Sequence, residues 1–264
     1  MAAPDPAFAT DGEPRAVTQI RDGLAAYEFE PFFQPIVRLS DASLVGFEAL
    51  ARWRHAERGL IEPADFIALA EETSLIVPVG EYVLSEVCNV LRRLAGFGLS
   101  SLPFIALNVS GRQLEDADFV ERVLAQTRAS GADATNLKLE ITESLVLDYA
   151  KVSALIERCH HAGIRVALDD FGTGYSNLGH LHKLSFDTLK LDQGFIRQLD
   201  DPRCLAIVRA VIGMAGALDC DIVAEGVETK EQLERLRGLG CQYAQGWLIG
   251  KPLDIESAIA LANA

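Results

Sequence analysis

The sequence is short of positive charge, of paired cysteines and of long apolar runs, and each shortage excludes a class of protein. Lysine and arginine number 24 against 38 acidic residues, so a basic surface for nucleic acid or an anionic membrane is not expected. The five cysteines form no Cys-x-x-Cys pair, which argues against a zinc site or a disulfide framework. The longest apolar stretch, residues 205–217, is interrupted by Arg209 and is too short to cross a bilayer. We therefore expect a cytoplasmic domain with no membrane segment and no DNA partner.

What the chain does contain is enough apolar sequence for one large domain, since 49% of its 264 residues are hydrophobic. Residues 1–18 are rich in alanine, proline and aspartate and show no sustained period. We expect this segment to be a disordered tail or a linker, and the folded domain to cover residues 19–264. A linker would imply a regulatory domain upstream.

From residue 32 onward the sequence alternates between short strands and amphipathic helices. Strands are predicted at residues 32–37, 44–50, 104–109, 137–141, 166–169, 188–192, 222–225 and 243–249. Helices are predicted at residues 19–27, from residue 63 onward, and at 83–94, 119–128, 149–161, 202–218, 230–239 and 254–262. This alternation is typical of parallel strands joined by right-handed crossovers, and the number of units favours a closed (β/α) barrel.

Most predicted strands break at or near their carboxyl end with a polar residue. These residues are Glu48, Asn108, Glu140, Asp169, Lys190, Glu225 and Gln245. Any one of them could mark an ordinary exit into a polar loop, but the closure of a barrel would bring all of them to one mouth. An apolar interior does not tolerate so many unpaired acids. Oxygen ligands without clustered histidine or cysteine suit Mg²⁺ or Mn²⁺.

The adjacent acids Asp169 and Asp170 follow an apolar run and precede a glycine-bearing loop. Consecutive strand residues point to opposite faces, so the two acids share a site only if the backbone turns there, as Gly172 and Gly174 would permit. Taken alone, the pair could be a proton site, a metal site or a solvated turn. The other strand-end acids favour a two-ion site, with Asp169 bridging ions about 3.5–4 Å apart, which is a common means of cleaving a phosphoester.

These residues also carry a resemblance to a known family. Glu48-Ala49-Leu50-Ala51-Arg52-Trp53 resembles the signature that names the EAL-domain cyclic di-GMP phosphodiesterases. The other motifs that are similar to those of this family are Gln34-Pro35-Ile36-Val37, Asn108-Val109-Ser110, Leu139-Glu140-Ile141-Thr142-Glu143, Asp169-Asp170-Phe171-Gly172-Thr173-Gly174-Tyr175-Ser176, Leu189-Lys190-Leu191-Asp192, Ala224-Glu225-Gly226-Val227-Glu228 and Gln245-Gly246. The similarity runs from about Ile20 to Leu253.

The resemblance implies a modified TIM (β/α)8 barrel whose first strand, residues 32–37, runs antiparallel to the others, instead of the all-parallel arrangement that the pattern alone suggests. It also implies two divalent cations, Mg²⁺ or Mn²⁺. The ligands of the first would be Glu48, Asn108, Glu140 and Asp169. The ligands of the second would be Asp169, Asp170 and Glu225. Ca²⁺ prefers longer bonds of about 2.3–2.6 Å, so we expect it to inhibit.

By the same resemblance the substrate is cyclic di-GMP and the product is linear pGpG. The residues implied to contact the substrate are Arg52, Gln34 and Asp192. The residues implied to act in catalysis are Lys190, Gln245 and Glu225, with the general base either Glu225 or a hydroxide formed by the ions with help from Lys190. Glu143 would anchor the loop of residues 170–176, whose position in this family couples dimer contacts to metal loading, so a homodimer is expected.

Two other functions stay open at this point. The domain could be a catalytically silent cyclic di-GMP receptor that signals to a partner, or, without the resemblance, a barrel glycosidase that uses Glu140 and Glu225. The departures from the family pattern are Ala68, Ser74, Asn177 and Gln242, and none of them is an implied metal ligand. Since every implied carboxylate is present, we predict an active enzyme.

Overall fold

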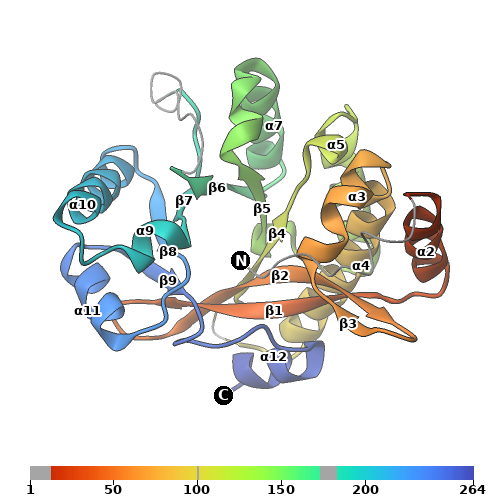
Figure 1. The fold of residues 1–264 in the computed structure, drawn as a ribbon, viewed down its shortest axis with the longest axis horizontal. Helices are drawn as coiled ribbons and strands as arrows, with labels where there is room; N and C mark the ends of the chain where they lie inside the picture. Colours follow the sequence, from red (N-terminus) through yellow and green to blue (C-terminus); the bar gives the residue numbers. More distant parts are fainter. Residues whose placement is uncertain (1–12, 100, 173–182) are drawn as a thin grey trace.

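The computed structural model describes residues 13–99, 101–172 and 183–264, in which helices surround a barrel of strands (Figure 1). Nine strands form one sheet in the order β1-β9-β8-β7-β6-β5-β4-β2-β3, and a further pairing of β1 with β2 closes all of them except β3 into a barrel. The strands are β1 (Phe29–Arg38), β2 (Leu44–His55), β3 (Gly59–Ile61), β4 (Phe104–Asn108), β5 (Leu137–Thr142), β6 (Arg165–Phe171), β7 (Thr188–Leu191), β8 (Asp221–Ala224) and β9 (Tyr243–Gln245).

The direction of β1 distinguishes this barrel from a regular TIM barrel. β1 pairs antiparallel with both of its neighbours, β2 and β9. The other neighbouring strands in the barrel pair in parallel. The predicted fold, a modified TIM barrel with its first strand antiparallel to the rest, is confirmed. A hairpin is possible here because β1 and β2 are joined by a short turn, whereas parallel neighbours need a crossover helix.

The helices in the described part of the chain lie mostly outside the barrel. They are α2 (Glu13–Ala25), α3 (Ile67–Glu72), α4 (Ile76–Ala95), α5 (Gly111–Leu114), α6 (Phe119–Ser130), α7 (Tyr149–His161), α9 (Gln193–Arg197), α10 (Pro202–Ala217), α11 (Lys230–Gly238) and α12 (Ile255–Ala262). Side-chain caps begin several of them: Asp201 accepts from the N–H of Arg203 at α10, and Asp254 accepts from Ser257 at α12. None of the helices described is long and apolar enough to span a membrane.

The barrel interior has an apolar layer beneath a polar one. Ile36, Phe104, Ala106 and Val223 form a small buried cluster that is separate from the main core. Since β1, β4 and β8 are not all neighbours in the sheet, this cluster lies inside the barrel. Side chains two residues apart share a face of a strand, so Asn108 and Glu225 follow Ala106 and Val223 on the inward face. The polar residues at the strand ends are therefore supported from below by packed apolar side chains.

Several boundaries differ from the sequence-based expectations. β1 begins at Phe29 and not at residue 32, and β2 continues to His55 and does not end at residue 50. α2 begins at Glu13, so residues 13–18 belong to a helix and not to the expected tail, because Ala16 and Ile20 lie one turn apart and are both buried. β6 continues through Asp170 to Phe171 instead of ending at residue 169. β9 ends at Gln245 and does not continue to residue 249; the backbone next comes so close to Val227 that a Cβ atom at Gly246 would lie 2.2 Å from the nitrogen of Val227. Neither β3 nor α9 is predicted from the pattern.

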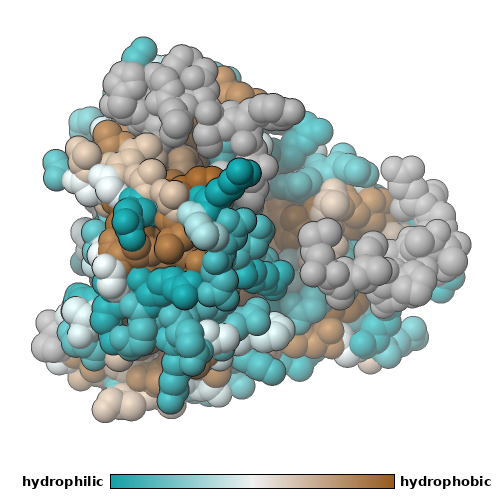
Figure 2. Space-filling view, turned by 60° about the vertical axis from the view of Figure 1, so that its left-hand side comes forward, coloured by the Kyte–Doolittle hydropathy of each residue, from teal (hydrophilic) through white to brown (hydrophobic). Residues whose placement is uncertain are grey.

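One side of α10 is apolar and exposed. The residues that face the barrel are Cys204, Val208, Val211, Ile212 and Ala215. On the opposite side Ile207 is 49% exposed, and Ala206, Ala210 and Gly213 are exposed beside it. Figure 2, which brings this side of the molecule forward, shows apolar residues gathered next to strongly hydrophilic ones. The helix therefore leaves an apolar strip uncovered by the described part of the chain.

Candidate metal centre at the carboxyl ends of the barrel strands

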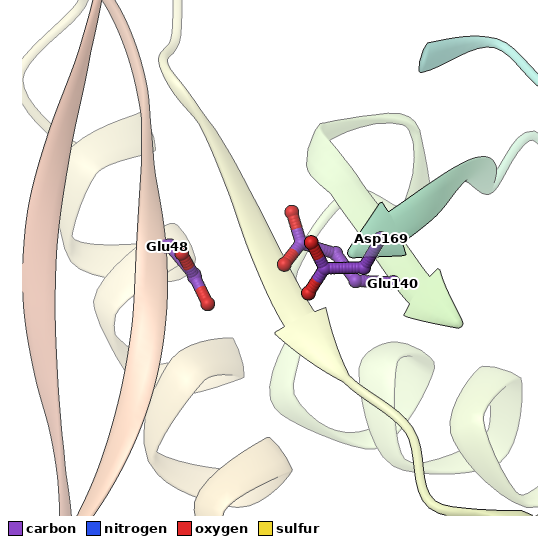
Figure 3. Close-up of side chains that lie close together, drawn as sticks. All are labelled: Glu48, Glu140 and Asp169. Carbon is purple, nitrogen blue, oxygen red and sulfur yellow. The ribbon is translucent and has the colours of Figure 1, made fainter. Parts of the chain in front are cut away.

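Carboxylates from separate strands converge at one end of the barrel. Glu48 of β2, Glu140 of β5 and Asp169 of β6 each offer an oxygen, and these oxygens all lie within 4.8 Å of one another. Figure 3 shows the three side chains directed into the space between their strands. A second set, Asp169, Asp170 and Glu225, meets the same limit. Asp169 belongs to both sets, as a residue that bridges two cations must.

Lys190 of β7 lies buried among these acids, with its side chain 1% exposed. Its Nζ is 2.6 Å from Glu140 Oε2, 2.7 Å from Glu225 Oε1, 3.2 Å from Asp169 Oδ1 and 3.3 Å from Glu48 Oε2. Burial by itself would lower the pKa of Lys190, but the four carboxylates hold that pKa well above its ordinary value. One ammonium faces four carboxylates, so the cluster keeps an excess of negative charge.

The pKa values of these acids shift in different directions. Burial raises the pKa of Glu140 well above its ordinary value and the pKa of Glu225 to about 8, although Lys190 opposes both shifts. Burial also acts to raise the pKa of Glu48, but the charge of Lys190 and hydrogen bonds from Gln245 and Asn108 outweigh it and leave that pKa lowered. The protein alone therefore does not fully stabilise Glu140 and Glu225 as anions. A divalent cation would supply the missing stabilisation.

The backbone at the adjacent acids departs from a regular strand. The register of β6 against β7 shifts between Leu168 and Phe171, and Asp170 has a positive φ of 55°. The N–H of Asp170 donates to Asp169 Oδ1 at 2.8 Å. Aspartate tolerates the left-handed region better than most residues. The backbone is therefore irregular at the two acids, as their sharing of one site requires, although β6 continues to Phe171; Gly172 follows with a φ of 94°, and Gly174 is outside the described residues.

Neutral amides complete the polar layer. Asn108 Nδ2 donates to Glu48 Oε1 at 2.7 Å, and Gln245 Nε2 donates to Glu48 Oε2 at 2.7 Å and to Gln34 Oε1 at 3.0 Å. Gln34 Nε2 in turn donates to the carbonyl of Gly250 at 3.2 Å. Gln245 Oε1 is buried and has no hydrogen-bond partner among the described residues. An orphaned acceptor beside the acids indicates that a water or a ligand group belongs there.

A cavity of about 310 Å³ opens over the acids. Its walls include Gln34, Glu48, Asp169, Asp170, Gln193, Arg197, Glu225, Gly226, Glu228, Gln245, Gly246 and Trp247. Lys190 is not part of these walls and lies beneath them. The oxygen-rich floor, the excess negative charge and the orphaned amide oxygen together fit divalent cations that are held by the protein and reached from the cavity.

Two residues expected to contact substrate lie elsewhere. Arg52 is buried, and its Nη2 lies 2.9 Å from Glu62 Oε2. Asp192 Oδ1 accepts from the N–H of Gly194 at 2.8 Å and caps α9. Neither residue lines the cavity, so their contacts with substrate stay predictions. Glu143 Oε2 accepts from the N–H of Gly172 at 2.8 Å, as a loop anchor would, while residues 173–176 of that loop are outside the described part.

Trp247 and Arg197 also line the cavity, although neither is among the site residues predicted from the sequence. Trp247 directly follows Gln245 and Gly246, so its position beside a strand-end polar residue was a usable signal. Arg197 had no such signal, because it lies on α9, a short helix whose position depends on how β7 and β8 pair.

Comparison with known proteins defines the family. The sequence model of the EAL domain matches residues 17–252, and the chain belongs to the EAL domain family. It is 38% identical over 85% of its length to the cyclic di-GMP phosphodiesterase PA2567 of Pseudomonas aeruginosa, and 40% identical over 91% of its length to the bifunctional diguanylate cyclase/cyclic di-GMP phosphodiesterase MucR of the same organism. The chain covers 38% of the first relative and 35% of the second.

The fold comparison agrees with this assignment. The structure matches that of the PaMucR phosphodiesterase in complex with c-di-GMP with a TM-score of 0.87 and 38% sequence identity, covering 92% of this chain and 99% of that one. The structure of the EAL enzyme Bd1971 with cAMP and cyclic-di-GMP bound matches with a TM-score of 0.89 and 31% identity, covering 96% of this chain and 70% of that one. The chain thus spans about a third of the length of the curated relatives and nearly all of a solved EAL structure.

Proposed function

We propose that this domain hydrolyses cyclic di-GMP to linear pGpG in a reaction that requires divalent cations. The observation that carries the proposal is the pair of acidic sets that share Asp169 on the floor of one cavity. Membership of the EAL family supports the choice of substrate, since relatives carry the name cyclic di-GMP phosphodiesterase and the PaMucR structure is a complex with c-di-GMP.

The proposal assigns two sites to the acids. Glu48, Asn108, Glu140 and Asp169 would hold one cation, and Asp169, Asp170 and Glu225 would hold the other. Oxygen ligands of this kind suit Mg²⁺ or Mn²⁺. Bound cations would attract the substrate phosphates to an acidic protein and lower the pKa of water.

The protein's own residues perform the remaining work. Gln245 is hydrogen-bonded to Glu48 and leaves Oε1 available to orient a water. Glu225 has 18% of its side chain exposed on the cavity wall. A bound cation would counter the burial that raises the pKa of Glu225 and would keep it ionised, so that it could take the proton of that water, whereas Lys190 already carries its protons. Attack of the water oxygen forms a new P–O bond and breaks the bond between phosphorus and the ribose 3′ oxygen, which takes up a proton from solvent and leaves as a hydroxyl. The product is the linear dinucleotide pGpG.

The first prediction concerns metal removal. Incubation of the purified chain with cyclic di-GMP and millimolar Mg²⁺ or Mn²⁺ is expected to yield pGpG, and an excess of EDTA should reduce the rate to background because the acids lose their counter-charge. Ca²⁺ alone should not support turnover, since it favours longer bonds. Chromatography of the nucleotides measures the product. Full recovery of the cyclic dinucleotide with saturating Mn²⁺ would contradict the proposal, and tight binding without product would favour the receptor function.

We also propose that the domain forms a homodimer through the apolar strip of α10. Replacing Ile207 by glutamate is expected to shift the mass measured by light scattering after size exclusion from twice the chain mass to the chain mass of 28.6 kDa, because a buried charge in an apolar contact is costly. Leu60→Glu, at an exposed leucine on β3, serves as the control and should stay dimeric. A monomeric wild type would rule out this contact. The regulatory domain upstream and the cytoplasmic location stay predictions.

A further inference from the structure

The two tryptophans of the chain have opposite environments. Trp53 is fully buried and packs against Phe29, whereas Trp247 is 66% exposed. Trp247 lies on the wall of the cavity, two residues after Gln245. An indole is among the largest apolar side chains, and leaving it in water forfeits the stabilisation that its burial would give. The exposed indole of Trp247 at the edge of a polar cavity therefore indicates that a bound molecule covers it.

The backbone holds Trp247 in a defined position. The N–H of Val227 donates to the carbonyl of Gln245 at 3.0 Å, and the N–H of Leu248 donates to the carbonyl of Val227 at 3.0 Å. Gly246 makes this close approach possible, because a Cβ atom there would lie 2.2 Å from the nitrogen of Val227. The backbone of Trp247 is thus held from both sides, because Gln245 and Leu248 each form a backbone hydrogen bond with Val227. Because the backbone of this residue is already held in place, its main chain loses little further freedom when a ligand binds.

Positive charge accompanies the indole. Lys251 Nζ lies 5.5 Å from the centre of the Trp247 ring, within the range of a cation–π contact. Arg197 lies on the wall of the same cavity, where its Nη2 is 3.6 Å from Glu228 Oε1. These two side chains are cations beside a cavity whose floor is acidic. An aromatic ring with nearby cations is the combination that holds the bases and backbone of nucleic acids without a duplex.

We propose that Trp247 is the stacking platform for one guanine base of the substrate, and this inference rests on the proposed function. A dinucleotide whose phosphodiester reaches the acids on the cavity floor must place its bases nearer the rim, where Trp247 lies. The planar face of guanine would cover the exposed indole and remove both apolar surfaces from water. Trp247 then determines how tightly the substrate binds and which register of the dinucleotide reaches the acids.

The test measures binding separately from hydrolysis. In Ca²⁺, cyclic di-GMP should bind the wild type and quench tryptophan fluorescence, and calorimetry should give the dissociation constant. Stacking of one base is worth about 1–3 kcal/mol, so Trp247→Ala should weaken binding by about 5- to 150-fold and remove most of the quenching. Trp247→Phe should bind within about threefold of the wild type. Phe97→Ala removes an exposed aromatic ring outside the cavity and serves as the matched control.

The outcomes separate the two proposals. Unchanged affinity and quenching in Trp247→Ala would overturn the stacking role alone, even if the enzyme is active. A wild type that does not bind cyclic di-GMP at all would overturn both proposals. In Mn²⁺ the loss should fall on KM more than on kcat, because stacking is made equally before and during the reaction. A loss confined to kcat would contradict a platform role.

Discussion

Replacement of Asp169 by asparagine is expected to abolish hydrolysis of cyclic di-GMP, with a loss of about 10³-fold or more in kcat. Asp169 is the one residue that belongs to both acidic sets, so a neutral amide there would weaken both cation sites at once. Removal of a residue that only supports a metal ligand costs about 10- to 100-fold, and removal of a shared ligand should cost more. Product formation at saturating Mn²⁺ measures the effect, while binding of cyclic di-GMP should survive in part.

The matched control for this change is Asp200→Asn. It removes a carboxylate of the same type from a fully exposed position, where Asp200 pairs with Arg235. Its kcat should stay close to that of the wild type. If Asp169→Asn kept a tenth or more of the wild-type rate, the shared-ligand arrangement would be wrong.

Replacement of Lys190 by methionine is expected to cause the largest loss of stability among single changes at the site. The ammonium contacts four carboxylates in a buried position, and its removal leaves them without the cation that now balances them. Breaking a buried ion pair from one side costs about 3–5 kcal/mol. For a domain of this size that corresponds to a fall in Tm of about 10 °C. Thermal unfolding in EDTA measures it.

Divalent cations should offset part of that loss. A cation that binds only the folded state stabilises it by about 2.7 kcal/mol at a hundredfold excess over its Kd. The rise in Tm on adding Mg²⁺ or Mn²⁺ should therefore be larger for Lys190→Met than for the wild type. Lys151→Met, at an exposed lysine on α7, controls for the change in charge and should alter Tm little. If Lys190→Met were as stable as the wild type in EDTA, the four carboxylates would not need a nearby positive charge to stay close together in the folded state.

The agreement between sequence and structure is best at the strand ends. Glu140 and Asp169 were identifiable because an acid near the end of an apolar run is a local pattern, and parallel strands bring their carboxyl ends together. Glu48 lies within the longer strand β2, where it was identifiable as a single acid in an apolar run. The irregular backbone at Asp170 was likewise predictable, because two adjacent acids can share a site only where the strand departs from its regular geometry. The antiparallel first strand was different, since the pattern alone suggested a parallel one and only the resemblance corrected it.

By itself, the sequence determined the barrel, the family and the acids at its mouth, because periodicity and motif order are local properties of the chain. Only the tertiary structure decided that Lys190 sits beneath four carboxylates, that Arg52 and Asp192 lie off the cavity, and that Trp247 stands exposed beside it. These facts depend on closure of the sheet between β1 and β2 and on the pairing of distant strands. A local sequence pattern indicates which face of a strand is buried. It does not indicate which charged side chains of distant strands lie close to that face inside the barrel.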